Sequence, residues 1–324
     1  MAARVNWDLQ HEFPAELFEV EAGDLHRVLS GPTLFDLRRA DKQPFFVATL
    51  LHGNEQSGWD AVRKFLRETP NASLVLLVGN VAAAAANMRH LLDEPDFNRI
   101  WRQPPWAELL NDLLRDVNPW CGIDIHNNSG PNPHYSVVTN LEDNTLALAS
   151  LFSDKLIFTS HTLDILGHAI AQHCPTLTIE TGSVADPSAV TRTYDLLKRL
   201  DALGRVPTAT CRALRSYETL GIVKAESQQD GFANYPVFAA NLAHMSFKEL
   251  SKDSVFAECI AEPWRLSVSN PSSELDFTEE YFERRNGKVV LKQNVVLSMF
   301  TSDPLLASQD CVCYLLRELN DLHG

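Results

Sequence analysis

PFFVATLLHGNEQSGWDAVRKFLRETPNASLVLLVGN, from Pro44 to Asn80, decides the fold class of this 324-residue chain. It opens with a continuous apolar run, Phe45 to Leu51, typical of a strand that is buried on both faces of a parallel sheet. The segment Ser57 to Glu68 then gathers its apolar residues on one helical face, and Leu74 to Val78 is a second apolar strand. A strand, a helix and a strand in about 35 residues predict a βαβ unit.

The same alternation continues to about residue 203. We expect three further strands and three further helices, in the order helix 106–117, strand 121–126, strand 135–138, helix 144–152, strand 177–179 and a helix whose N-cap is Asp186. Residues 1 to about 40 look like a polar lead-in with short apolar pieces. The pattern predicts an α/β fold, in which helices cover both faces of a sheet to give three α/β/α layers.

The character of the sequence changes near residue 205, after which helical periodicity weakens. Short β-leaning runs follow, separated by turn residues, at 221–224, 255–257, 288–291 and 312–316. We therefore predict a catalytic domain over residues 1–205 and a smaller β-rich domain over residues 206–324. A β-rich domain that restricts access to the site would favour small substrates over proteins.

Composition and charge exclude several classes of protein. Hydrophobic residues make up 45% of the chain and charged residues 22%, which is normal for a packed protein. The net charge of 28 − 42 = −14 argues against a nucleic acid as the main partner, and no apolar run is long enough to span a bilayer. The start of the chain lacks an apolar signal segment, and the six cysteines are irregularly spaced. We expect a cytoplasmic protein with reduced thiols, and the sequence leaves open whether it forms a homo-oligomer.

The chemistry-bearing residues follow the predicted strands. P-loop, G-x-G-x-x-G and G-x-S-x-G motifs are absent from the sequence, but His52-Gly53-Asn54-Glu55 comes directly after the first strand. His-x-x-Glu is a usable two-ligand zinc unit, and open α/β sheets place their ligands at such strand ends. The alternative is a solvated loop with an ordinary surface histidine and glutamate.

Two later strands also end in polar residues. Asp124 and His126 lie two apart, so they share one face of a strand, where His126 could supply a third metal ligand and Asp124 could orient a ligand histidine. Glu180 closes the strand 177–179, and burial there would raise its pKa toward that of a general base. The alternatives are a polar strand end bonded to the backbone and a glutamate that has simply reached the surface.

Together these residues fit a catalytic zinc site better than a magnesium or calcium site. His52, Glu55 and His126 would be the ligands of one zinc ion per chain and would leave a position for water, from which Glu180 would take a proton. Arg89, Asn98 and Arg99 lie between the first two strand ends in the sequence and could form an anion-binding wall. Surface salt bridging is the alternative for either arginine.

In this order the motifs resemble the zinc-dependent succinylglutamate desuccinylase/aspartoacylase family of the zinc carboxypeptidase superfamily. The matching segments are His52-Gly53-Asn54-Glu55 with Gly58, 80–89, 96–99, 124–127 and 179–182. The resemblance implies that His52, Glu55 and His126 bind zinc and that Glu180 is the general base and later the proton donor to the leaving amine. It further implies that Arg89 polarises the scissile carbonyl, and that the substrate-binding residues are Asn98, Arg99 and Asn127.

Two departures from the family pattern concern the substrate. Aspartoacylases place an arginine shortly before the general base, whereas 168–179 contains none, which disfavours N-acetylaspartate. The stretch between Arg89 and Asn98 is also longer and contains Pro95. The resemblance implies a hydrolase that cleaves the amide bond of a small N-acyl amino acid and binds a substrate carboxylate. A metallocarboxypeptidase acting on short peptides and a non-catalytic zinc-containing binding protein are the alternatives.

Overall fold

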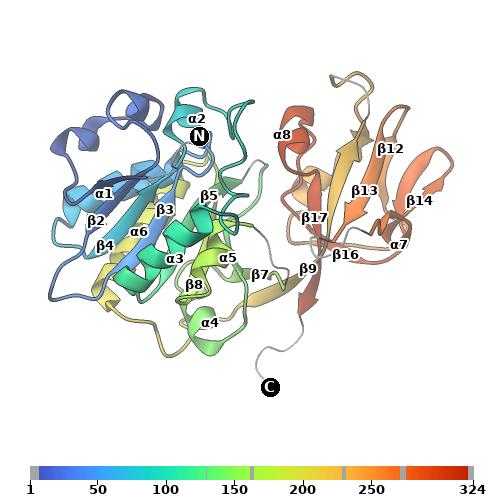
Figure 1. Cartoon of the computed structure of the whole chain (residues 1–324). Helices are drawn as coiled ribbons and strands as arrows, with labels where there is room; N and C mark the ends of the chain where they lie inside the picture. The colour runs from blue at the N-terminus through green and yellow to red at the C-terminus, as the bar shows by residue number, and fades with distance from the viewer. Residues whose placement is uncertain (1–6, 129, 161–163, 228–230, 271–274, 320–324) are drawn as a thin grey trace. The chain divides into compact units, whose positions relative to one another are not determined.

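The computed structural model describes residues 7–128, 130–160, 164–227, 231–270 and 275–319 (Figure 1). The chain divides into two compact units. The first comprises Met1–Asn127, His134–Leu156 and Leu163–Leu214, and the second comprises Asn128–Pro133, Ile157–Thr162 and Arg215–Gly324. The predicted division after residue 205 stays a prediction. Within the described ranges, no helix combines the length and the apolarity needed to cross a bilayer.

The first unit contains a mixed sheet with helices on both faces. Its strands, wholly or partly in this unit, are β1 (Asp8–Gln10), β2 (Thr33–Leu37), β3 (Phe45–Thr49), β4 (Leu74–Val78), β5 (Gly122–Asn128), β6 (Tyr135–Val138), β7 (Lys155–Phe158) and β8 (Thr176–Ser183). Its helices are η1 (Ala15–Glu19), η2 (Ala22–Arg27), α1 (Ser57–Glu68), α2 (Val81–Ala85), α3 (Trp106–Val117), α4 (Asp143–Ala149), α5 (Leu166–Ile170) and α6 (Ser188–Leu203). The strand order is β1-β2-β4-β3-β5-β8-β6-β7.

The predicted βαβ unit is confirmed, because β3 pairs in parallel with β4 and α1 connects them. Side chains of β3 alternate between two buried faces. Phe46 and Ala48 belong to the apolar cluster that contains Leu110 of α3. Phe45 instead faces α1, where the centroid of its ring lies 6.3 Å from that of Phe65. α1 packs against α6 on one face, and α3 packs against α5 on the other. The α/β fold with three layers is therefore present in the first unit.

Some boundaries differ from those predicted. β5 runs on to Asn128, and hydrogen bonds from the side chains of Asn127 and Asn128 inside the protein allow these polar residues to be buried. The N-cap of α6 is Pro187, although Asp186 still accepts a hydrogen bond from the backbone N–H of Ser188 at 2.9 Å. The expected polar lead-in instead contains β1, β2, η1 and η2, and β2 pairs antiparallel with β4.

The second unit is built of antiparallel strands, as predicted for the β-rich part of the chain. Its larger group of hydrogen-bonded strands has the order β13-β9-β17-β16-β11, and its smaller sheet has the order β10-β12-β15-β14. The strands are β9 (Arg215–Glu226), β10 (Val237–Phe238), β11 (Glu249–Leu250), β12 (Val255–Cys259), β13 (Arg265–Ser269), β14 (Phe282–Arg285), β15 (Lys288–Leu291), β16 (Val295–Ser298) and β17 (Cys313–Leu319). The helices are η3 (Leu242–His244), α7 (Thr278–Tyr281) and α8 (Pro304–Gln309). One apolar cluster, which includes Val223, Phe256 and Leu315, forms its core.

Candidate metal centre

The first two site residues lie in the turn between β3 and α1. The turn begins at Leu50, whose φ of 57° places it in the left-handed region, and continues through His52 and Glu55. Gly53 is required here by packing, because a Cβ on this residue would lie 2.1 Å from the backbone carbon of Ala83 in α2. The backbone N–H of Gly53 donates to the carbonyl of Arg89 at 3.2 Å, which ties the turn to the segment after α2.

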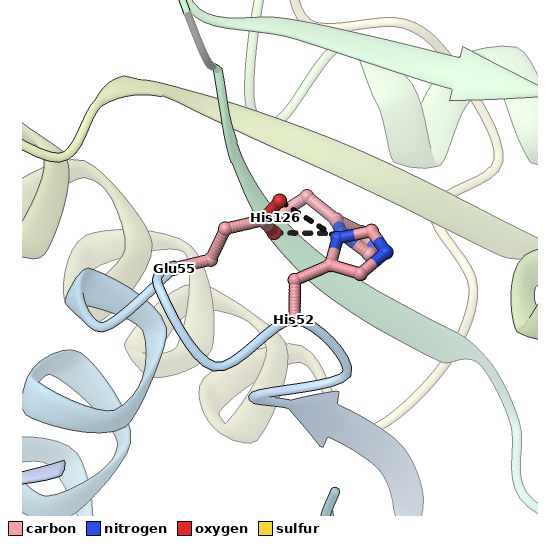
Figure 2. A group of neighbouring side chains, drawn as sticks. All are labelled: His52, Glu55 and His126. Carbon is pink, nitrogen blue, oxygen red and sulfur yellow. Dashed lines mark hydrogen bonds and ion pairs between the residues drawn. The ribbon is translucent and has the colours of Figure 1, made fainter. Parts of the chain in front are cut away.

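His52, Glu55 and His126 form one compact group (Figure 2). The Nδ1 atoms of His52 and His126 lie 2.7 and 2.8 Å from the two carboxylate oxygens of Glu55, respectively. All three side chains are buried, and their potential ligand atoms lie within 4.8 Å of one another. The structure therefore brings together the three residues that the sequence predicts as ligands.

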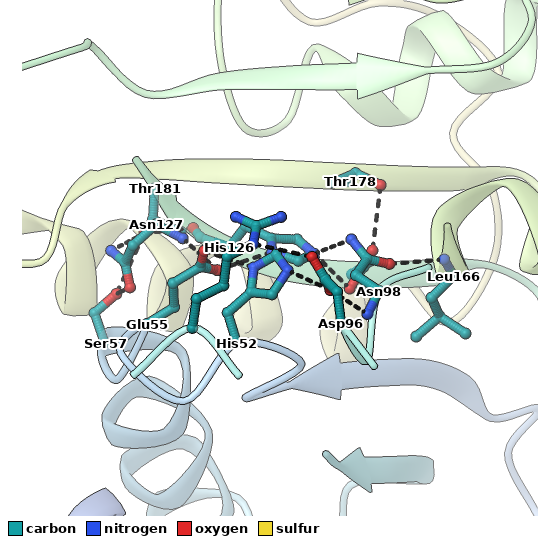
Figure 3. A network of polar contacts seen from close by, with 12 residues as sticks. His52, Glu55, Ser57, Asp96, Asn98, His126, Asn127, Leu166, Thr178 and Thr181 are labelled. Carbon is teal, nitrogen blue, oxygen red and sulfur yellow. Dashed lines mark hydrogen bonds and ion pairs between the residues drawn. The ribbon is translucent and has the colours of Figure 1, made fainter. Parts of the chain in front are cut away.

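A second carboxylate lies behind each imidazole. Asp96 Oδ1 is 3.2 Å from Nε2 of His52, as Figure 3 shows. Asp124 Oδ1 is 3.1 Å from Nε2 of His126. The carboxylate of Asp96 accepts a hydrogen bond from His52, which favours a proton on Nε2 and leaves Nδ1 of His52 to face the candidate metal position. Asp124 faces His126 Nε2 as an ion-pair partner. Asp124 thus lies behind His126, its orienting role stays a prediction, and Asp96 lies in the corresponding position behind His52.

The charges of the group determine how its protons are held. Burial raises the pKa of Glu55, but the positive charges of His52 and His126 outweigh burial and lower it. Burial also raises the pKa of Asp96, which its hydrogen bond to His52 and the neighbouring charges of His52 and Arg89 lower overall. For His126, burial lowers the pKa, and the negative charges of Asp124 and Glu55 raise it well above its usual value. His126 thus holds a proton more tightly than an ordinary imidazole when no metal ion is bound.

The arginines and the asparagine of the predicted anion wall differ in exposure. Arg89 is buried, and its Nε donates to Asp96 Oδ2 at 3.0 Å. Asn98 is also buried, with Nδ2 at 3.4 Å from His126 Nε2 and Oδ1 accepting from the backbone N–H of Leu166. Arg99 is exposed, and its Nη1 donates to the carbonyl of Asn98 at 2.9 Å. Arg89 and Asn98 thus contact the group around the two histidines.

Asn127 is turned into the protein, so its predicted contact with substrate stays a prediction. Its side-chain amide donates to Thr181 Oγ1 at 2.8 Å and to the carbonyl of Gly182 at 3.0 Å, and it accepts from Ser57 Oγ at 2.8 Å. Its backbone N–H donates to Glu55 Oε2 at 3.1 Å. These contacts make Asn127 a support for a predicted metal ligand.

Glu180 lies in β8, which neighbours β5 in the sheet. Thr178 Oγ1 is 3.5 Å from Asp124 Oδ2, and Thr178 and Glu180 share a face of β8 because they are two residues apart. By the same alternation, His126 shares the face of β5 that carries Asp124. Glu180 is 8% exposed and projects from the same face of the sheet as His126. Its role as general base stays a prediction.

Sequence reasoning did not assign a role to Asp96, Ser57 or Thr181. Asp96 belongs to a matched motif, but it lies in an irregular segment, and its contact with His52 spans 44 residues of sequence. Ser57 and Thr181 lie beside residues that were singled out, and this adjacency is the signal that could have found them. Thr181 follows Glu180 on β8 and therefore points to the opposite face, where it can support the site, whereas Ser57 opens α1.

The sequence matches no family model, and comparison with curated proteins gave no match. Solved structures do match. Succinylglutamate desuccinylase from Vibrio parahaemolyticus is 14% identical at a TM-score of 0.59, with 90% of this chain and 87% of that chain covered. Succinylglutamate desuccinylase/aspartoacylase from Rhodobacter sphaeroides is 12% identical at a TM-score of 0.57, with 90% of this chain and 89% of that chain covered. Murine aminoacylase 3 is 14% identical at a TM-score of 0.58, with 87% of this chain and 97% of that chain covered. The resemblance predicted from the motifs is therefore confirmed in the fold.

Proposed function

We propose that this protein is a zinc-dependent hydrolase that cleaves the amide bond of a small N-acyl amino acid. The observation that carries the proposal is the pair of buried histidines whose Nδ1 atoms converge on Glu55 while Asp96 and Asp124 lie behind them. The fold supports it, because the matching structures include desuccinylases and an aminoacylase.

The donor set fits zinc. Two imidazole nitrogens and a carboxylate oxygen are typical zinc ligands, whereas magnesium and calcium prefer oxygen alone. The charge of the group also fits a divalent cation. With Glu55, Asp96 and Asp124 ionised, Arg89 charged and both imidazoles neutral, the six side chains carry 1 − 3 = −2, which one Zn²⁺ would balance. His52, Glu55 and His126 would hold the ion.

A zinc ion in such a site supplies Lewis acidity, which makes water a nucleophile near neutral pH. Glu180 would accept a proton from the attacking water on its carboxylate and later return it to the leaving amine nitrogen. The guanidinium of Arg89 would donate to the scissile carbonyl oxygen as negative charge develops there. The bond from Arg89 to Asp96 would fix that guanidinium relative to His52.

The proposed substrate carries one carboxylate. Arg99 is the exposed cation of the predicted wall, and a guanidinium can bind a carboxylate with two parallel hydrogen bonds. The segment 168–179, where aspartoacylases have their second carboxylate-binding arginine, contains no arginine in this chain. We therefore place N-acyl derivatives of neutral amino acids ahead of dicarboxylates.

The test combines metal analysis with a substrate panel. We expect about one zinc per purified chain, lost in His52→Ala and kept in Glu180→Gln, with hydrolysis abolished in both. The exposed Glu108 gives a matched control, since Glu108→Gln should keep both metal and activity. The panel sets N-acyl amino acids against short peptides.

Each other outcome contradicts a defined part of the proposal. Cleavage of peptides alone would replace the deacylase with a metallocarboxypeptidase. Zinc without hydrolysis of any member would favour a binding protein. A native protein that takes up no zinc from buffered zinc solutions would remove the metal centre itself.

A further inference from the structure

Three buried side chains link the segments that carry the candidate site. Ser57 lies at the N-terminus of α1, Asn127 in β5 and Thr181 in β8, and their exposures are 4%, 3% and 0%. Each follows a residue of the proposed site by one or two positions in the sequence. Figure 3 shows these three side chains together on one side of the histidine pair. We call them the Ser57–Asn127–Thr181 clamp.

The donor and the acceptor of these hydrogen bonds of the clamp can each be assigned. The carbonyl of Gly182 can only accept, so the amide nitrogen of Asn127 must face it, at 3.0 Å. The second amide hydrogen then goes to Thr181 Oγ1 at 2.8 Å, and Asn127 Oδ1 accepts from Ser57 Oγ at 2.8 Å. The hydroxyl proton of Thr181 goes to the backbone carbonyl of His126 at 3.0 Å. The side-chain amide of Asn127 is therefore fixed on both its nitrogen and its oxygen.

The clamp reaches the proposed metal ligands through backbone groups. Asn127 donates its backbone N–H to Glu55 Oε2 at 3.1 Å, so the orientation of that carboxylate depends on the position of Asn127. Thr181 holds the carbonyl of His126 and precedes Gly182, whose φ of 99° turns the chain at the end of β8. Asn127 and Thr181 point to the opposite face from their neighbours His126 and Glu180, because successive strand residues alternate. The clamp is consequently shielded from substrate.

We infer that the Ser57–Asn127–Thr181 clamp is a positioning device, which sets Glu55 and His126 for metal binding and Glu180 for proton transfer; this inference rests on the proposed function. The three residues act through others and are not catalytic. Because the clamp joins three segments far apart in the sequence, loss of one member loosens the register between β5, β8 and the turn before α1. Such support fixes ligand geometry more tightly than the fold alone.

The alternative is that the clamp only contributes to folding stability, and a second buried threonine separates the two. Thr193 in α6 is also 0% exposed, and its Oγ1 donates to the carbonyl of Ala189 at 3.0 Å. Thr181→Val and Thr193→Val therefore make the same chemical change at the same burial, and only the first is connected to the site. Thr181→Ser retains the hydroxyl and serves as the conservative variant.

The experiment measures four quantities on the full chain. The zinc dissociation constant is measured by competition with a chromophoric chelator. The kinetic constants kcat and KM are measured for the substrate that the panel identifies, and the Tm is measured on the metal-free protein. We expect Thr181→Val to weaken zinc binding by about 10- to 100-fold. It should lower kcat with little change in KM, whereas Thr181→Ser should match the native protein. Thr193→Val should lower the Tm while leaving zinc affinity and kcat unchanged. If Thr181→Val does not fold, Ser57→Ala provides the same measurements.

The outcomes distinguish the clamp from the proposed function. A native protein that binds zinc and hydrolyses substrate, with Thr181→Val and Ser57→Ala equal to it in zinc affinity and kcat, overturns the clamp alone. Equal losses of zinc affinity in Thr181→Val and Thr193→Val also overturn it, because a general loss of stability then explains both. A native protein with neither zinc nor hydrolysis overturns the proposed function and the clamp with it.

Discussion

Replacing Asp96 with asparagine should separate carbonyl polarisation from metal binding. Asp96 accepts three hydrogen bonds: from His52 Nε2 at 3.2 Å and the backbone N–H of Asn98 at 2.8 Å on Oδ1, and from Arg89 Nε at 3.0 Å on Oδ2. The variant keeps the shape of the side chain and removes its charge. One of its two terminal atoms becomes an N–H₂ donor, and the structure determines which one.

The backbone N–H of Asn98 can only donate, so the variant's amide oxygen should stay at the Oδ1 position. The new N–H₂ group then faces the Nε–H of Arg89, and two donors repel each other. Arg89 would lose its fixed direction toward the scissile carbonyl. Removing one donor to a developing oxyanion typically lowers kcat by about 10²- to 10³-fold, which corresponds to about 2.7–4 kcal/mol. We expect a loss in that range for Asp96→Asn.

Zinc binding should suffer less in the same variant. Nε2 of His52 still has an oxygen to donate to, although that oxygen is now neutral. We therefore expect the zinc dissociation constant to rise by about tenfold, or about 1.4 kcal/mol, at the lower end of the range for residues that support metal ligands. Asp124→Asn is the matched variant, because Asp124 Oδ1 lies 3.1 Å from His126 Nε2 and Asp124 Oδ2 accepts from Thr178 Oγ1 at 3.5 Å. It should weaken zinc binding and leave kcat at saturating zinc nearly intact.

The assay measures kcat and KM at saturating zinc and, separately, zinc affinity by chelator competition. Asp96→Asn should show a large loss in kcat and a small loss in zinc affinity, and Asp124→Asn should show the reverse ranking. If Asp96→Asn turns over within about threefold of the native protein at saturating zinc, a loss of about 10²-fold is excluded and Asp96 does not position Arg89. A complete loss of zinc from Asp96→Asn would show instead that the charge of Asp96 is needed to bind the ion.

Three other predictions concern the turn, the pH and the metal itself. Gly53→Ala should abolish zinc binding and lower the Tm, because the new Cβ would lie 2.1 Å from the backbone of Ala83. A Cβ at Gly31 would have no atom within 4 Å, so Gly31→Ala should leave both quantities unchanged in the same thermal and chelator assays. Zinc affinity measured by competition should fall as the pH is lowered. The negative charges of Asp124 and Glu55 outweigh burial and raise the pKa of metal-free His126, so protons compete with the zinc ion for this side chain. A zinc affinity that does not depend on pH would contradict His126 as a ligand. Zinc at about 100 times its dissociation constant should add about 2.7 kcal/mol to the free energy of unfolding, and an unchanged Tm on chelation would contradict a native-state site.

The sequence predicts the elements of the first unit where local pattern and tertiary structure agree. The helix Ser57–Glu68 and the strand Leu74–Val78 appear at the predicted residues, because a one-sided apolar helix between two buried strands has few ways to pack. His52 and His126 meet for a similar reason. Each follows or ends a parallel strand, and β3 and β5 are neighbours, so their carboxyl ends lie at one edge of the sheet.

The features that sequence reasoning missed depend on contacts between distant segments. β2 is a five-residue strand whose place in the sheet follows from pairing with β4, and nothing in Thr33–Leu37 alone distinguishes it from a short apolar piece of a loop. Asp96 has no regular element around it, so neither helical nor strand periodicity indicates where its side chain points. Its role becomes visible only when His52 and Arg89 lie on its two oxygens.

The register of β5 explains why a metal ligand and its support can be consecutive residues. β5 pairs with β3 through Phe46↔Gly122 and Ala48↔Asp124, which sends His126 to one face and Asn127 to the other. A slip of one residue would exchange them and place an amide where the imidazole must be. Gly122 opposes that slip, since a Cβ there would lie 2.5 Å from Cγ2 of Ile170, so a larger side chain does not fit at this point of the strand. The position of the proposed ligand is thus set by close packing at the start of the strand, on the same face and four residues earlier.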